Sequence, residues 1–123
     1  MIEIYTREEG HHLIEMINDA ISHGRIKSWI VDSEGDYTRS DDSWKERAWM
    51  RYLQDEDDPN HLWFVIVQPK DQSISKAVYG VYHGRFAEML LTHFDTFISD
   101  LGISPLLTDH DIYSRELEAT TTV

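Results

Sequence analysis

The sequence contains no cysteine, few prolines and less than half as many basic residues as acidic ones. Without cysteine the chain has no disulfide, no thiolate metal site and no cysteine nucleophile, and we expect it to work in the cytoplasm. The longest unbroken apolar run, Leu62–Val67, is far shorter than the roughly 20 residues of a membrane-spanning helix. The first ten residues, MIEIYTREEG, lack the basic and apolar regions of a signal peptide.

Negative charge is the most informative feature that the sequence does have. The 23 aspartate and glutamate residues outnumber the 11 lysine and arginine residues, which gives a formal net charge of −12 at pH 7. Ten of the acids, but only four bases, lie between Asp32 and Asp58. Charge of this density lowers stability through self-repulsion and speeds the capture of a basic partner. It also repels phosphate, so we expect no direct contact with nucleic acid.

The composition nevertheless belongs to a folded protein. Hydrophobic residues make up 41% of the chain and aromatic residues 11%, whereas a disordered acidic tail is poor in both. With 123 residues the chain is long enough to bury a core of its own. We therefore expect a single domain over residues 1–123.

The first part of the chain predicts a strand followed by a helix. Apolar residues alternate in Ile2–Tyr5 and then follow helical spacing over residues 7–23. Thr6 and Glu9 match a capping box at the start of this helix. Gly24 is expected to end it in the left-handed conformation.

The acidic middle of the chain predicts two short strands and a second helix. The strands are expected at Ser28–Ser33 and Tyr37–Arg39, joined by a tight turn. Ser43 and Glu46 match another capping box, and the apolar stripe that follows predicts a helix over residues 42–54.

The remaining elements complete an α+β fold. Leu62–Gln68 is apolar on both faces, which is typical of a central strand, and Lys76–His83 is predicted to be its antiparallel neighbour. A third helix is expected from Gly84 to Leu101, and residues 103–123 have no clear periodicity. The predicted order is β-α-β-β-α-β-β-α, a central antiparallel sheet packed by two or three helices.

Three alternating acids, Asp32, Glu34 and Asp36, are the first candidate site. On an extended segment their carboxylates lie on one side, and three convergent carboxylates suit Mg²⁺ or Ca²⁺. The spacing of Gly35 does not fit an EF-hand. We interpret the group as a solvated hairpin tip and expect no metal.

The histidines are the second candidate site. His11 and His12 are adjacent, so on a helix they should point about 100° apart and chelate one ion poorly. His110 lies between Asp109 and Asp111 in the aperiodic segment, and His93 lies on the apolar stripe of the last predicted helix. We expect structural or incidental roles for these residues, and no cofactor.

Tyr82–Phe86 is more unusual, because it is predicted to join a strand to a helix. Backbone N–H groups at a helix start favour an anion, so an anion-binding or catalytic pocket with His83 as base and Arg85 as clamp is one interpretation. The other is a tight turn at Gly84 with Arg85 in an ion pair. The second interpretation is the more common structural outcome.

Tryptophans are candidates for anchoring a partner. Trp63 lies in the predicted central strand and is expected in the core. Trp44 and Trp49 flank the helix predicted inside the acidic segment, and the sequence leaves open whether they belong to the core or to an interface. An aromatic side chain among acids is what a contact with a basic partner needs, since the ring supplies buried area and the charges steer association.

The chain resembles the bacterial immunity proteins of contact-dependent growth inhibition systems. The resemblance rests on small size, absence of cysteine, strong acidity and lack of a catalytic motif, together with the stretch VYHGRFAEMLLTHFD at Val81–Asp95. Such proteins bind the toxin domain of their own system, commonly a basic nuclease, and block it. They are alike in role rather than in sequence, so the resemblance transfers no site residues.

The predicted function is therefore that of a non-catalytic, cytoplasmic protein that occludes the active site of a basic toxin domain. The alternatives are a non-catalytic adaptor or regulatory subunit and a small metal-dependent hydrolase that uses His83 and Arg85. The sequence leaves the oligomeric state open. The charge argument predicts these partner-binding residues: Asp32, Glu34, Asp36, Asp41, Asp42, Trp44, Trp49, Asp55, Glu56, Asp57 and Asp58.

Overall fold

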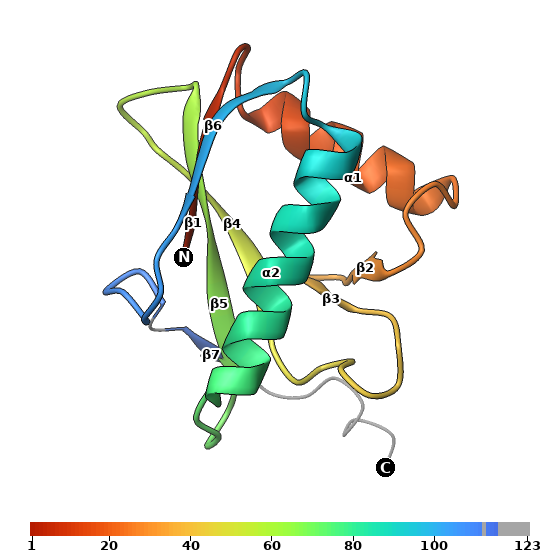
Figure 1. Cartoon of the computed structure of the whole chain (residues 1–123), viewed down its shortest axis with the longest axis vertical. Coiled ribbons are helices and arrows are strands. Elements are labelled where there is room, and N and C mark those ends of the chain that lie inside the picture. The colour runs from red at the N-terminus through yellow and green to blue at the C-terminus, as the bar shows by residue number, and fades with distance from the viewer. Residues whose placement is uncertain (112, 116–123) are drawn as a thin grey trace.

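The computed structural model describes residues 1–111 and 113–115, which form an antiparallel sheet with two helices on one side (Figure 1). The predicted α+β class is confirmed. The elements follow one another in this order: β1 (Ile2–Thr6), α1 (His11–Ser22), β2 (Trp29–Val31), β3 (Tyr37–Arg39), β4 (Trp49–Gln54), β5 (His61–Pro69), α2 (Lys76–His93), β6 (Ile98–Ile103) and β7 (Ser114–Arg115).

Strand β5 lies in the middle of the sheet, as its apolar sequence predicts. The strand order is β2-β3-β4-β5-β1-β6, and all these neighbours are antiparallel. Ile2 of β1 and Tyr52 of β4 both lie opposite Phe64 of β5. The short β7 pairs in parallel with the last two residues of β5.

The core lies between the sheet and the two helices. Alternate residues of the central strands, such as Ile4 and Phe64, are fully buried there. Helix α2 contributes Phe86, whose ring packs edge-on against Trp29 at a centroid distance of 5.0 Å. Burial of each such side chain stabilises the fold by about 1.5–3 kcal/mol.

The opposite face of the sheet, called the outer face below, is covered only in part. Trp49, Val65 and Val67 are buried at the end where β7 pairs with β5. There the carboxylate of Asp111 accepts a hydrogen bond from the backbone N–H of Ile66 at 2.9 Å. The other end of the outer face, around the start of β5 and the end of β1, carries polar and aromatic side chains.

Two predicted boundaries need correction around α1. The helix begins at His11, not at residue 7. Thr6 belongs to β1 and its hydroxyl donates to the backbone oxygens of Glu8 and Asn60, so no capping box forms. The prediction for Gly24 is confirmed, because its φ of +75° is left-handed.

The predicted helix over residues 42–54 is wrong. Residues 41–47 form turns in which Glu46 has a φ of +57°, and Trp49–Gln54 is the strand β4. Six residues of β4 pair with β5. The segment has an apolar pattern compatible with either structure, and pairing with the central strand decides between them because strand preference depends on tertiary context.

The predicted strand at Lys76–His83 is also wrong, because this segment is the first half of α2. Ser75 caps the helix by accepting a hydrogen bond from the backbone N–H of Val78 at 3.1 Å. The helix ends at His93, and Ile98–Ile103 is not helical but forms the edge strand β6. The chain therefore has two helices in its described part, in the order β-α-β-β-β-β-α-β-β.

Candidate functional site

Three loops meet at one end of the molecule, at the top of Figure 1. The β1–α1 loop is joined to the β4–β5 loop by a hydrogen bond from Gly10 N to Pro59 O of 2.7 Å. It is joined to the α2–β6 loop by a hydrogen bond from Arg7 N to Phe97 O of 2.9 Å. Acids that are distant in sequence therefore share one surface.

We call this surface the acidic end. It is formed by Glu8, Glu56, Asp57, Asp58 and Asp95, of which all but the half-buried Asp58 are exposed. Within residues 1–111 and 113–115 none of the five has an ion-pair partner. Arg7 is the one lysine or arginine in these three loops, and it donates its Nε–H to the backbone oxygen of Thr96 at 3.1 Å. No cationic side chain of the described residues therefore pairs with these carboxylates.

The β4–β5 loop is held in shape by its own polar groups. Asp55 accepts a hydrogen bond from Asp57 N, and Asp58 accepts one from Asn60 N, each at 2.9 Å. The side-chain amide of Gln54 donates to the backbone oxygens of Asp55, Asp58 and His61. A loop fixed before binding loses less conformational entropy when a partner arrives.

His61 connects this loop to the outer face of the sheet. Its Nδ1 lies 2.7 Å from Asp55 Oδ2 and its Nε2 lies 2.7 Å from Glu3 Oε2. Partial burial lowers the pKa of His61, but the hydrogen bonds to the two carboxylates outweigh it and raise the pKa above its ordinary value. Hydrogen bonds from both ring nitrogens to carboxylates require a proton on each nitrogen, which is the charged form that a raised pKa favours. The pKa of Asp55 is lowered in turn, chiefly by the hydrogen bond from His61.

Tyr5 stacks on His61 with a centroid distance of 4.3 Å and remains 40% exposed. Loss of solvation and the nearby carboxylates raise the pKa of its hydroxyl; those carboxylates are Glu3, Asp58, Asp100 and Asp55. An exposed aromatic ring among carboxylates attracts cations through both its face and the charges around it. We call Glu3, Tyr5, Asp55, Asp58 and Asp100 the Tyr5 patch, which shares Asp58 with the acidic end.

Sequence reasoning missed Tyr5 as the aromatic residue among the acids. Trp49 is 1% exposed and lies under the guanidinium of Arg115. Trp44 is half-buried against the core, with Arg47 over its ring at 5.2 Å. Trp63, expected in the core, is half-buried on the outer face and stacks on His110 at 5.1 Å.

The outward position of Tyr5 could have been predicted from the alternation of Ile2–Tyr5. This alternation places Glu3 and Tyr5 on the face opposite Ile2 and Ile4.

The first acids of the sequence-predicted segment are engaged inside the protein. The Arg115 guanidinium lies 2.7 Å from a carboxylate oxygen of each of Asp32, Glu34 and Asp36. Arg51 adds a bidentate contact to Asp36 at 2.9 and 2.8 Å. The group is therefore neither a metal site nor a fully solvated tip: Asp36 is 1% exposed, and only Glu34 is exposed.

The acidic segment 32–58 is consequently not one surface. Asp36 lies beside Arg51 near the start of β4, whereas Asp55 follows the end of that strand. Between them, Asp41 pairs with Arg39 at 3.1 Å and Asp42 is exposed. The proposed contact surface keeps Asp55–Asp58 and gains acids from the other two loops.

The predicted pocket of His83 and Arg85 does not form. Both residues lie in the middle of α2 rather than at its start, so the backbone N–H groups there are bonded within the helix. His83 is buried, with its Nδ1 2.9 Å from Tyr79 O and its Nε2 2.9 Å from the Met1 amino nitrogen. Burial lowers the pKa of His83 to about 4. Arg85 is exposed and pairs with Glu88 at 3.2 Å.

Among the other histidines, the predicted positions of His93, His11 and His12 need correction. His93 is exposed rather than in the core. In the aperiodic segment it is Asp111 that is structural, since its carboxylate accepts hydrogen bonds from Thr108 N and Ile66 N. The rings of His11 and His12 do not point apart: their centroids are 4.2 Å from each other.

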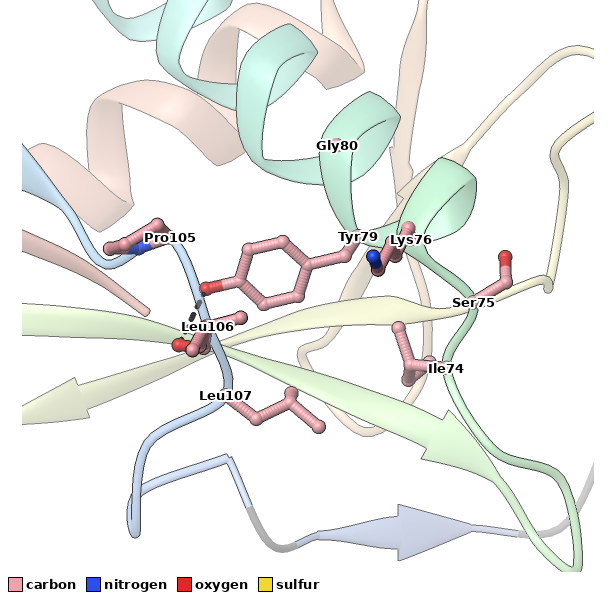
Figure 2. A pocket seen from close by; sticks show the side chains of 8 residues that line it. All are labelled: Ile74, Ser75, Lys76, Tyr79, Gly80, Pro105, Leu106 and Leu107. Carbon is pink, nitrogen blue, oxygen red and sulfur yellow. Dashed lines mark hydrogen bonds between the residues drawn. The ribbon is translucent and has the colours of Figure 1, made fainter.

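An apolar groove lies at the other end of α2 (Figure 2). It has a volume of about 640 Å³ and is lined by Ile74, Ser75, Lys76, Tyr79, Gly80, Pro105, Leu106 and Leu107. The Tyr79 hydroxyl donates to the backbone oxygens of Ser104 and Leu106, which fixes one wall. Lys76 is the one charged side chain among these lining residues, so the groove holds no acid–base pair.

Comparison with known proteins gives no information about this site. No protein-family model matches the chain, and no significant match is found among curated proteins or solved structures. No helix in the described part of the chain is long and apolar enough to cross a membrane.

Proposed function

We propose that this protein is a cytoplasmic immunity protein, which binds a basic toxin domain through its acidic end and occludes the active site of that domain. The observation that carries the proposal is the meeting of three loops that expose carboxylates without ion-pair partners in the described structure. A nuclease domain is a suitable target, because it must present lysine and arginine to bind phosphate. A surface of carboxylates competes with the phosphates for these side chains.

Unpaired charge supports rapid capture. Exposed carboxylates at one end of a protein with a net charge of −12 attract a basic partner over several ångströms, and such steering raises association rates toward 10⁸–10⁹ M⁻¹s⁻¹, on the order of the diffusion limit. A cell that makes a toxin needs this speed. The internally bonded β4–β5 loop supports it further, since little reordering is required on contact.

The Tyr5 patch adds an aromatic side chain against which a partner packs, and charged residues alone do not provide such a contact. Charged rims change association rates, whereas most binding energy comes from a few well-packed aromatic or arginine side chains. We propose that a partner arginine or lysine lies over the Tyr5 ring and pairs with Glu3 or Asp100. In this arrangement His61 holds the ring and the Asp55 loop in place and does not itself perform chemistry.

The experiment is to identify a toxin domain among the proteins encoded next to this gene and to measure the protection of cells that express it. The acidic-end variant combines Glu8→Gln, Glu56→Gln and Asp57→Asn, none of whose side chains makes a described hydrogen bond. The matched control combines Asp42→Asn, Asp71→Asn and Asp109→Asn, which removes the same charge from exposed sites elsewhere. We expect the parent and the control to protect and the acidic-end variant to protect poorly. Equal protection by both variants would refute the proposed surface.

The apolar groove favours a second candidate function, that of a non-catalytic adaptor. Leu106 is 75% exposed and Leu107 is 50% exposed, and exposed leucines beside a groove are typical of protein-binding surfaces. An adaptor of this kind would lose partner binding on Leu106→Ser and keep it in the acidic-end variant. The hydrolase alternative gains no support from the geometry, because buried His83 and exposed Arg85 do not converge.

A further inference from the structure

Glu9, His11 and His12 bring three metal-binding groups together at the start of α1. One ligand atom from each residue lies within 4.8 Å of the other two. Glu9 Oε2 is 3.7 Å from His11 Nδ1, and the two imidazole rings are 4.2 Å apart. All three side chains are exposed, so an ion can reach them without any opening of the fold.

The spacing fits a small transition-metal ion after minor rotation of the side chains. Three atoms that lie within 4.8 Å of one another have a common point about 2.8 Å or less from each, against roughly 2.0–2.2 Å for zinc bound to histidine and carboxylate. Exposed side chains close a gap of this size by small rotations. Two imidazoles and one carboxylate are also a ligand set that zinc uses when it keeps a fourth position for water.

The surroundings favour a cation. Glu15 Oε1 lies 3.3 Å from His12 Nδ1, and a carboxylate bonded to one ring nitrogen leaves the lone pair of the other nitrogen free for a metal. Glu8 precedes Glu9 and belongs to the acidic end. The positive end of the α1 dipole opposes a cation, but the charges of Glu8, Glu9 and Glu15 exceed this partial charge.

We propose that Glu9, His11 and His12 form a zinc-binding site with an open fourth position, at the edge of the acidic end. The site is separate from the Tyr5 patch and independent of the proposed toxin-binding role. Water fills the fourth position.

The test is calorimetric titration of the tag-free protein with zinc chloride at pH 7.5. We expect one site, and at least tenfold weaker binding in each of the variants His11→Ala, His12→Ala and Glu9→Gln. The matched control is His23→Ala, which removes an exposed histidine at the far end of the same helix, where it pairs with Asp19 at 3.1 Å. The control should bind zinc as the parent does.

Two further measurements make the result decisive. Cobalt substitution should give the strong visible absorption of a four-coordinate site in the parent and not in His12→Ala, while magnesium should not compete. Binding should also weaken as the pH is lowered, because protons compete with the metal for the ligand atoms. The proposal is overturned if the parent binds no zinc, if His23→Ala weakens binding as much as His11→Ala does, or if magnesium displaces zinc as from a simple carboxylate surface.

Discussion

Arg115 and Asp36, which are 79 residues apart in the sequence, form a buried ion pair of 2.7 Å. The guanidinium also lies over the ring of Trp49, 4.3 Å from its centroid, so it is held between an aromatic face and carboxylates. This contact uses Asp32, Glu34 and Asp36 to attach β7 to the β2–β3 hairpin. The sequence suggests that these acids are available to bind a partner, but in the structure they form ion pairs within the protein.

Arg115→Met should destabilise the protein by about 3–5 kcal/mol, because it leaves the largely buried Asp32 without its cationic partner and Asp36 with Arg51 alone. Urea unfolding followed by tryptophan fluorescence measures the loss. Arg85→Met is the control: its ion pair with Glu88 is exposed, so a change within about 0.5 kcal/mol is expected. Similar small losses for both variants would mean that β7 is not held by Arg115.

Phe86→Ala should cost about 3–5 kcal/mol of unfolding free energy, since it removes a fully buried ring that contacts Trp29, Tyr37 and Phe64. A thermal melt detects the loss. Leu91→Ala, at a 54% exposed position of the same helix, should leave the melting temperature nearly unchanged. A small effect at Phe86 would place the core elsewhere than between α2 and the sheet.

The His61 bridge should make stability depend on pH in a defined direction. Because the folded state raises the pKa of His61, its contribution is fully present below the unfolded value of about 6.5 and is lost as the pH rises through the folded pKa. The lowered pKa of Asp55 adds a contribution that is present above about 3.8 and lost as the pH falls through its folded pKa.

We therefore expect the unfolding free energy of the parent, relative to His61→Gln, to be greatest between about pH 4 and 6.5 and to fall toward pH 8. Denaturant titrations across this range measure the difference. NMR titration of the ring protons gives an independent reading, in which His61 titrates above its ordinary pKa and His83 near 4. A difference in stability that does not change with pH would contradict the bridged imidazolium.

Much of the fold follows from local sequence, but β4, the first half of α2 and β6 do not. Alternation in Ile2–Tyr5, helical spacing before Gly24 and the apolar run of β5 each determine one local structure. The apolar pattern of Trp49–Gln54 is compatible with both a helix and a strand. Pairing with β5, which is a non-local interaction, makes this segment a strand. The valines and tyrosines of Lys76–His83 favour a strand locally, yet the Ser75 cap and packing of Tyr82 and Phe86 make this segment a helix.

The candidate site was also predictable only in part, because its assembly depends on contacts between residues that are distant in the sequence. The acids of the Asp55–Asp58 loop are evident in the sequence, and so is the outward position of Tyr5. Their assembly with Glu8 and Asp95 depends on β1 lying between β5 and β6, which places the three loops at one end. Strand order of this kind is set by long-range pairing and is not encoded in any short stretch.

The acidic end should control how fast a partner binds while leaving the fold intact. Its exposed carboxylates repel one another, so Glu8→Gln, Glu56→Gln and Asp57→Asn together should leave the melting temperature unchanged or slightly higher. A lower melting temperature would mean that these acids stabilise the fold through contacts other than those described.

The association rate constant of the partner toxin domain, measured by stopped-flow fluorescence across salt concentrations, tests the central claim most directly. For the parent and the control (Asp42→Asn, Asp71→Asn and Asp109→Asn), we predict fast association that slows steeply as salt screens the charges. For the acidic-end variant we predict association at least tenfold slower at low salt, with a much flatter salt dependence. If the acidic-end variant associates as fast as the control at every salt concentration, the acidic end is not the surface that captures the partner.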